Sequence, residues 1–180
     1  MVQSESPFNT PEYWEALGKF VQEFSEAERE AQALLWSMTA QDMRVAAAIY
    51  RDGMDLRPVI ETLRKLYPIL VTDGRSRGVF EETMRQFDRI REMRNKLLHN
   101  GATFTAQGAQ VILKLRGMRN PERPPPSFPM SRDELDAMAA DCTQIAGLCF
   151  TLVVLQDNPP DWQVQEDWEV RWNYTAPPNG

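Results

Sequence analysis

The 180-residue sequence predicts a mainly α-helical protein, an antiparallel bundle of four to five helices with a small β-hairpin after the fourth helix. Three observations predict this class. Long segments carry apolar side chains at three- and four-residue steps, which is the spacing of one helix face. Capping residues stand before these segments, and glycines follow several of them. After residue 101 the pattern changes to short alternating runs, as in strands.

The first two helices are expected to span the N-terminal quarter of the chain. Thr10 is suited to the N-cap and Pro11 to the first helical position, so we expect a long helix that ends near Met38. A weaker capping box predicts a short helix over 39–50, which Gly53 would stop.

The next two helices are expected to be joined by a short loop. Asp55 can cap a third helix, with Pro68 disturbing its last turn. The segment 71–78 (VTDGRSRG) is expected to be a loop. A second long helix is predicted over 79–100, and Gly101 is placed to end it in the left-handed conformation.

The C-terminal half combines strands, a stiff connection and one more helix. Residues 103–106 and 111–115 predict a hairpin around a turn at Gly108. The proline-rich segment 120–129 (NPERPPPSFP) is expected to be an ordered surface connection. A Ser-x-x-Glu capping box predicts a final long helix over 131–156.

The length fits one domain, which we expect over residues 1–157. The acidic tail over 158–180 contains three tryptophans. Large side chains alternate from Trp168 to Tyr174, so the tail is expected to pack on the domain or on a neighbour, as an edge strand would.

The formal net charge of −6 argues against a protein that coats nucleic acid non-specifically. However, residues 85–123 carry nine basic and three acidic side chains, a local charge of +6 that leaves −12 for the remainder. Such a patch suits selective contact with a polyanion. The alternative is a solvated helix that forms its own ion pairs.

Localisation is expected to be cytoplasmic, without a membrane span. No stretch reaches the ~18 consecutive apolar residues of a span, and the N-terminus lacks the pattern of a signal peptide. Cys142 and Cys149 lie on one predicted helix and are expected to be buried, inert thiols in a reducing compartment.

The predicted helix over 79–100 carries a group of polar residues on its apolar face. On a helical wheel, Arg94 falls inside the apolar arc, and Asn95 and His99 line its edge one turn apart. A guanidinium in that setting needs either a carboxylate from another helix or an arriving phosphate. His99 is the only histidine, and the cysteines lack metal-site spacing, so no metal site is expected. A helix cap or a packed ring is the alternative role for His99.

The run from Arg94 to His99 (RNKLLH) matches the RNxxxH form of the arginine–histidine motif of the HEPN superfamily, and it stands at the C-terminal end of a long helix. The chain therefore resembles a bacterial-type HEPN domain over residues 11–157. The resemblance implies a metal-independent endoribonuclease that needs no cofactor, works as a homodimer through the helix 79–100 and leaves a 2′,3′-cyclic phosphate. Gly101 stands where HEPN toxins paired with minimal nucleotidyltransferases often carry tyrosine, so the chain departs from that toxin–antitoxin branch.

The resemblance also implies roles for the motif residues. Arg94 would bind the scissile phosphate, Asn95 would orient that group or the histidine, and His99 would act as general acid or base. We further expect substrate contacts from Arg91 and Lys96 beside the motif, with Asp88 supporting Arg91 from behind. Further contacts are expected from the hairpin, through Lys114, Arg116 and Arg119. For these last three residues, a solvated hairpin face is the alternative.

The expected partners are a second copy of the chain, RNA or a nucleotide, and a protein inhibitor. A role in defence or stress response would suit the nuclease. The alternative function is a non-catalytic, HEPN-like dimer that binds nucleotides, RNA or proteins and regulates them.

Overall fold

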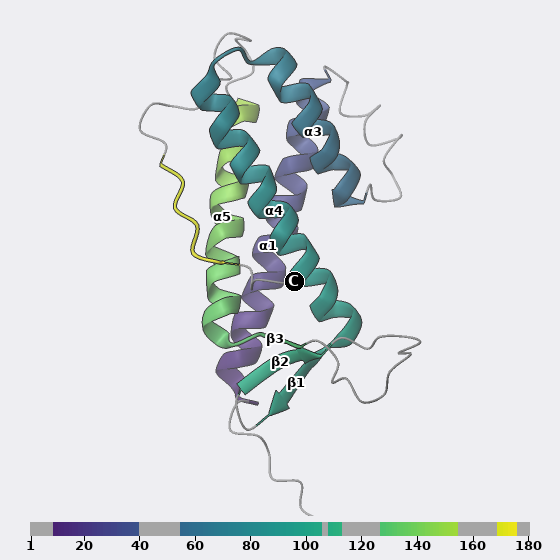
Figure 1. The fold of residues 1–180 in the computed structure, drawn as a ribbon, viewed down its shortest axis with the longest axis vertical. Coiled ribbons are helices and arrows are strands. Elements are labelled where there is room, and N and C mark those ends of the chain that lie inside the picture. The colour runs from purple at the N-terminus through teal and green to yellow at the C-terminus, as the bar shows by residue number, and fades with distance from the viewer. Residues whose placement is uncertain (1–8, 40–54, 106–107, 113–126, 155–168, 176–180) are drawn as a thin grey trace, which may run out of the picture.

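The computed structural model describes residues 9–39, 55–105, 108–112, 127–154 and 169–175. Within these ranges the chain is mainly helical, with a small antiparallel sheet after α4, as the sequence predicts (Figure 1). The expected short helix over 39–50 lies outside the described residues, apart from Thr39. The described elements are α1 (Pro11–Met38), α3 (Leu56–Leu70), α4 (Gly74–Asn100), β1 (Ala102–Thr105), β2 (Gly108–Ile112), β3 (Ser127–Pro129) and α5 (Arg132–Val154).

Local capping sets the start of α1 and of α5. The Thr10 hydroxyl accepts a hydrogen bond from the Tyr13 N–H (3.3 Å), and Pro11 occupies the first turn. At α5 the Glu134 carboxylate accepts from the Ser131 N–H (2.5 Å), while the Ser131 hydroxyl accepts from the Glu134 N–H (3.3 Å). Both predicted caps are confirmed, because each depends on residues only three apart.

The helices are not antiparallel throughout. A short connection joins α3 to α4, and the two helices run in opposite directions. Between them, Tyr67 stacks on Phe80 at 3.9 Å between ring centroids. α1 and α5 lie side by side and both begin at the sheet end (Figure 1). Thr143 of α5 donates a hydrogen bond to Glu23 of α1 (2.9 Å) along this contact. The two helices are parallel because the sheet and α4 intervene between them in the chain, so no tight turn constrains their direction.

The predicted loop over 71–78 is wrong for residues 74–78, because α4 begins at Gly74. The Asp73 carboxylate caps this extra turn by accepting from the Ser76 N–H (2.6 Å). Ser76 itself is fully buried. Glycine and serine are typical of loops, but here a good N-cap and burial extend the helix.

α3 continues past the proline that was expected to disturb it. Pro68 lies inside the helix, which ends at Leu70. The Arg77 guanidinium donates hydrogen bonds to the carbonyls of Pro68 (2.7 Å) and Val71 (2.6 Å). These bonds satisfy carbonyl groups that the end of a helix leaves without an internal partner.

A hairpin is confirmed, but its second strand begins at Gly108, where the turn was expected, and a third strand joins it. Phe104 of β1 pairs with Ala109 of β2, and β2 pairs with β3 through Phe128. Residues 127–129 were expected to belong to a connection without strands, and this part of the prediction is wrong. Phe128 is buried, which favours pairing, and Pro129 is tolerated because β3 is an edge strand. Residues 113–115 of the predicted hairpin lie outside the described part.

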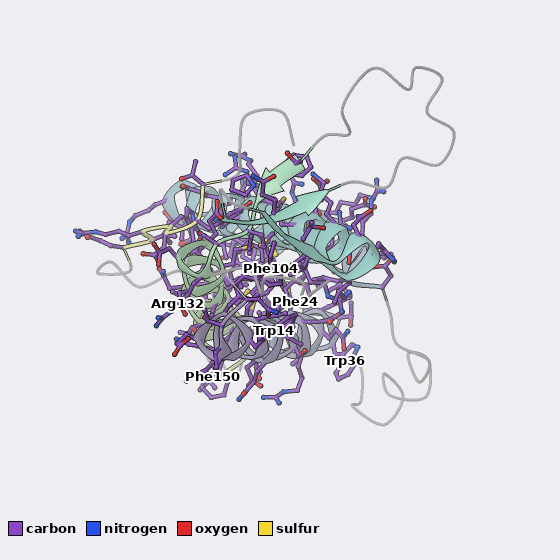
Figure 2. All side chains as sticks on the ribbon, turned by 90° about the horizontal axis from the view of Figure 1, so that it is seen from below. Trp14, Phe24, Trp36, Phe104, Arg132 and Phe150 are labelled. Carbon is purple, nitrogen blue, oxygen red and sulfur yellow. The ribbon has the colours of Figure 1, made fainter. Side chains whose placement is uncertain are left out.

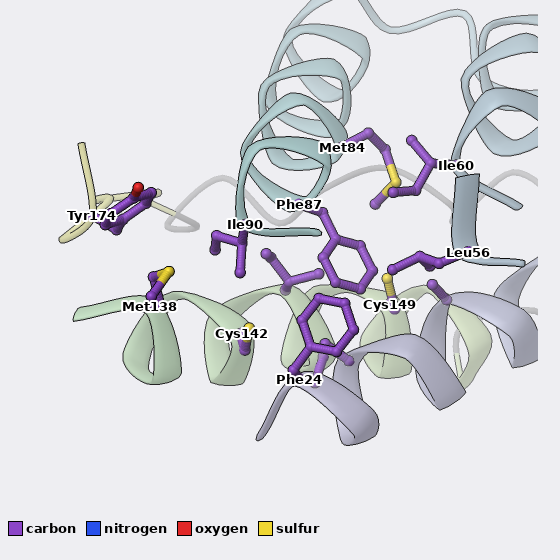
Figure 3. Close-up of a cluster of buried hydrophobic side chains, with 14 of the residues drawn as sticks. Phe24, Leu56, Ile60, Met84, Phe87, Ile90, Met138, Cys142, Cys149 and Tyr174 are labelled. Carbon is purple, nitrogen blue, oxygen red and sulfur yellow. The ribbon is translucent and has the colours of Figure 1, made fainter. Parts of the chain in front are cut away.

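The core lies where α1, α4 and α5 face one another (Figure 3). Phe24 of α1 meets Phe87 of α4 at 5.7 Å between ring centroids. Ile90 and both cysteines are buried in the same cluster. α4 is therefore held by its apolar face, and its orientation decides where the motif residues point.

By length and composition alone, α5 is apolar enough to cross a membrane, with a mean hydropathy of 1.6 over its most apolar window. Half of that window is buried inside the protein. α5 packs along α1 and carries the buried carboxylate of Asp141. A core helix meets the same criteria as a membrane span, so its packing accounts for the apolar character of α5.

The described part of the tail docks on α4 and α5. Asp141 is fully buried and accepts hydrogen bonds from the backbone N–H groups of Asn173 (2.8 Å) and Tyr174 (3.0 Å). It also accepts from the Asn173 side-chain amide (2.9 Å) and from Gln86 of α4 (2.8 Å). Tyr174 is buried beside Met138 (Figure 3). One carboxylate thus joins the tail to two helices.

The two thiols are expected to resist alkylation in the native protein. Burial raises the pKa of Cys149 to about 12, and burial beside Asp141 also raises the pKa of Cys142. Little reactive thiolate therefore forms at pH 8. Mass spectrometry after iodoacetamide treatment should find both cysteines unmodified in the native protein and both modified in urea. Rapid native modification of either thiol would contradict this packing.

Candidate functional site

Arg94 projects from α4 toward α1. Its guanidinium lies 5.2 Å from the ring centroid of Phe24, which is within range of a cation–π interaction. The Arg94 Nη1 donates a hydrogen bond to the side-chain oxygen of Asn95 (3.2 Å). Arg94 is half-buried. The prediction from the helical wheel that a guanidinium stands within the apolar face is therefore confirmed.

Arg94 lines an open cleft of about 500 Å³ between three helices. α1 forms one wall, and the beginning of α3 forms another. Ligand pockets in proteins commonly enclose ~300–1,000 Å³, so the cleft is large enough for a small organic group. The described residues that line it are Ser25, Glu28, Arg29, Gln32, Asp55, Leu56 and Arg94.

Among the described residues, no carboxylate pairs closely with Arg94. In the described part of the chain, Arg94 forms no ion pair within 4.0 Å. Glu28 is half-buried; burial raises the pKa of its carboxyl, Arg94 lowers that pKa, and Asp55 raises it, with a net increase. Arg29, by contrast, is paired with Glu26 and Glu30. Arg94 therefore offers the cleft a positive charge that interacts with Glu28 but forms no close ion pair within the described residues.

His99 is exposed in the last turn of α4, beside Leu98, whose side chain is 53% exposed. At about 100° per residue, the side chains of Arg94 and His99 diverge by ~140° around the helix axis. Asn95 and His99 differ by only ~40°. A single copy thus presents Arg94 to the cleft and His99 to solvent, and one copy does not bring the two groups together.

Arg91 and Lys96, the other described candidates for substrate contact, are already engaged. Arg91 forms an ion pair with Asp88 (2.8 Å), so its charge is balanced within its own helix. The Lys96 ammonium lies 4.5 Å from the ring centroid of Phe128 on β3. Neither side chain lines the cleft of Arg94. The remaining candidates, Lys114, Arg116 and Arg119, lie outside the described residues.

An aromatic cluster fixes the sheet beside the start of α1. Phe104 of β1 lies 5.1 Å from Tyr13 and 6.0 Å from Trp14, both in edge-to-face geometry. Figure 2 looks along the helices from the sheet end and labels Trp14, Phe104 and Phe24. Since β1 follows directly on α4, these contacts hold the C-terminal end of the motif helix next to α1.

The sequence did not reveal the opposite wall of the cleft. Ser25, Glu28 and Gln32 recur at three- and four-residue steps and form a polar stripe on α1. This stripe is visible in the sequence, but it is also what any solvated helix face shows. Only the packing of α1 against α4 shows that it faces Arg94.

Arg94→Met is expected to fold with a free energy of unfolding within ~1 kcal/mol of the unsubstituted protein. Methionine can still pack on Phe24, and no carboxylate in the described ranges loses an ion pair. Breaking a buried ion pair would instead cost ~3–5 kcal/mol. Urea denaturation followed by circular dichroism measures the difference, and a loss in that upper range would assign Arg94 to stability alone.

Within the described residues, no three histidine, cysteine, aspartate or glutamate side chains gather as they would around a metal ion. The chain matches no family model, no curated protein and no solved structure. The function must therefore be inferred from the site itself.

Proposed function

We propose that the chain is a metal-independent endoribonuclease of the HEPN kind, in which two copies of the motif helix α4 form one cleft. Arg94 binds the scissile phosphate, Asn95 holds Arg94 in position, and His99 transfers protons. The observation that carries the proposal is a half-buried guanidinium without a close carboxylate in the described chain, at the wall of an open cleft.

The chemistry needs no group beyond these side chains and the RNA. The ribose 2′-hydroxyl gives its proton to one imidazole as its oxygen bonds to phosphorus. The bond from phosphorus to the 5′-oxygen breaks, and that oxygen takes a proton back from the same, now protonated, imidazole. The products are a 2′,3′-cyclic phosphate and a 5′-hydroxyl. Imidazole exchanges protons near neutral pH, and a fixed cation stabilises charge on the phosphoryl oxygens.

A second basic side chain lines the cleft of Arg94, whereas the N-terminal end of α3 is already capped by the Asp55 carboxylate, which accepts from the Arg57 N–H (3.3 Å). The Arg29 side chain adds a second cation at the rim, although its carboxylate partners weaken its attraction for an anion. Arg94 is therefore expected to be the main phosphate contact.

A homodimer through α4 would supply what one copy lacks. Because His99 and Arg94 diverge on a single helix, a complete site requires His99 of one copy to approach Arg94 of the other. Leu98 supports this arrangement, since its exposed apolar side chain lies one turn beyond Arg94 on the same helix face. Location in the cytoplasm, a protein inhibitor and a role in defence belong to the same proposal.

The divergence of Arg94 and His99 around the helix axis favours a second candidate function. A dimer, or a single copy, that binds RNA or a nucleotide through Arg94 without cutting it would need no meeting of Arg94 and His99. In that case Arg94→Ala would weaken binding, and His99→Ala would change nothing.

The proposal is tested by incubating the protein with single-stranded RNA in the presence of EDTA and identifying the product ends by mass spectrometry. We expect 2′,3′-cyclic phosphates from the unsubstituted protein and their loss in Arg94→Ala. Arg132→Ala, which removes an exposed arginine from the start of α5, is the matched control and should cleave normally. Intact RNA with the unsubstituted protein would exclude the nuclease function.

A further inference from the structure

The cleft beside Arg94 contains polar groups that phosphate binding does not use. Within the described residues, the side chains of Glu28 and Gln32 form no hydrogen bond, although both line the cleft. The Ser25 hydroxyl donates to the Val21 carbonyl (2.8 Å), and its oxygen can still accept a hydrogen bond. The wall formed by α1 is therefore rich in acceptors that face the cleft.

These acceptors suit hydrogen-bond donors of a ligand, whereas Arg94 suits an anionic group. Glu28 and Asp55 would repel a phosphate, whereas Arg94 would attract it. A ligand that fits both walls carries an anionic group at one end and N–H donors at the other. A ribonucleotide unit has this pattern when its base presents donors on its Watson–Crick edge.

We propose that this cleft binds the nucleobase attached to the ribose next to the scissile phosphate. Guanine is the preferred base, and Glu28 recognises it through hydrogen bonds. The inference rests on the proposed function, which identifies the ligand as RNA. Guanine presents two adjacent donors, its ring N1–H and its exocyclic amino group, which match the two oxygens of one carboxylate. Gln32 lies one turn along α1 and can contact either a donor or an acceptor.

The other bases fit this wall less well. Uracil presents a single N–H between two carbonyl oxygens, and a carboxylate would repel both of them. Adenine and cytosine each present one amino group beside a ring acceptor, so a carboxylate gains one hydrogen bond instead of two. The half-buried position of Glu28 strengthens the distinction, because a carboxylate that has lost part of its hydration depends more on the donors of its ligand.

The test measures the binding of guanosine 3′-monophosphate and uridine 3′-monophosphate by isothermal titration calorimetry. The unsubstituted protein should bind the guanosine nucleotide at least about tenfold more tightly, since a bidentate contact discriminates by this order. Glu28→Gln should remove the preference, because an amide offers only one acceptor. Glu15→Gln, an exposed glutamate on the opposite face of α1, is the matched control and should retain it.

Equal affinities of the unsubstituted protein for the two nucleotides would overturn the inference. A guanosine preference that survives in Glu28→Gln would also overturn it, and so would the absence of binding of either nucleotide at millimolar concentration. Arg94→Ala separates this result from the proposed function. If Arg94 binds the phosphate, its loss weakens both nucleotides by the same factor and leaves their ratio unchanged. RNA that stays intact in the cleavage assay removes the nuclease proposal without altering the ratio measured here.

Discussion

Asp141→Ala is expected to destabilise the protein by ~3–5 kcal/mol, the largest effect on stability that we predict. Asp141 is fully buried in α5 and accepts four hydrogen bonds: from Gln86, from the backbone N–H and the side-chain amide of Asn173, and from the backbone N–H of Tyr174. Alanine leaves the buried donors of Gln86 and Tyr174 without this acceptor, whereas Asn173 is exposed and can bond to water. Bonds to a charged acceptor each contribute ~1.5–3 kcal/mol, and a buried donor without a partner adds its own penalty.

Urea and thermal denaturation measure this effect, and the midpoint temperature should fall by about 10 °C. Asp136→Ala is the matched control, because Asp136 lies on the same helix but is partly exposed and, among the described residues, pairs only with Arg132. It should change the free energy of unfolding by less than ~1 kcal/mol. Hydrogen exchange should also quicken at Tyr174 in Asp141→Ala. An equally small effect for both variants would mean that Asp141 does not hold the tail.

The elements whose signals are local were predictable from the sequence. Thr10 with Pro11, and Ser131 with Glu134, mark helix starts through contacts between neighbours in the chain. The start of α4 was missed for a related reason. Glycine and serine after Asp73 are common in loops, and the signal that overrides them is the burial of Ser76, which is a tertiary property.

The candidate site was predictable only in part, because its two walls come from distant parts of the chain. The position of Arg94 on an apolar face follows from the helical period. That Glu28 stands across the cleft from it depends on the packing of Phe24 against Phe87, and no short-range pattern encodes that contact. The same limit applies to Asp141, whose partner Asn173 is 32 residues away.

His99→Ala is expected to lower the rate of RNA cleavage by ~10²–10⁴-fold, the usual contribution of a general acid or base, while the affinity for RNA changes little. The reason for unchanged affinity is geometric. His99 is exposed and points away from the cleft of its own copy, so the phosphate contact through Arg94 remains. Single-turnover kinetics with excess protein separate the cleavage rate from binding. A cleavage rate equal to that of the unsubstituted protein would exclude His99 from proton transfer.

A mixture of two inactive variants tests whether the two copies share one site. If Arg94 of one copy works with His99 of the other, a dimer of Arg94→Ala with His99→Ala retains one intact pair. Mixing the two variants and allowing subunits to exchange should therefore restore cleavage well above the sum of the separate activities. If each copy used its own Arg94 and His99, every subunit in the mixture would lack one of them. No recovery in a mixture that demonstrably contains the mixed dimer would show that the two copies do not share a site, and α4 would then serve binding alone.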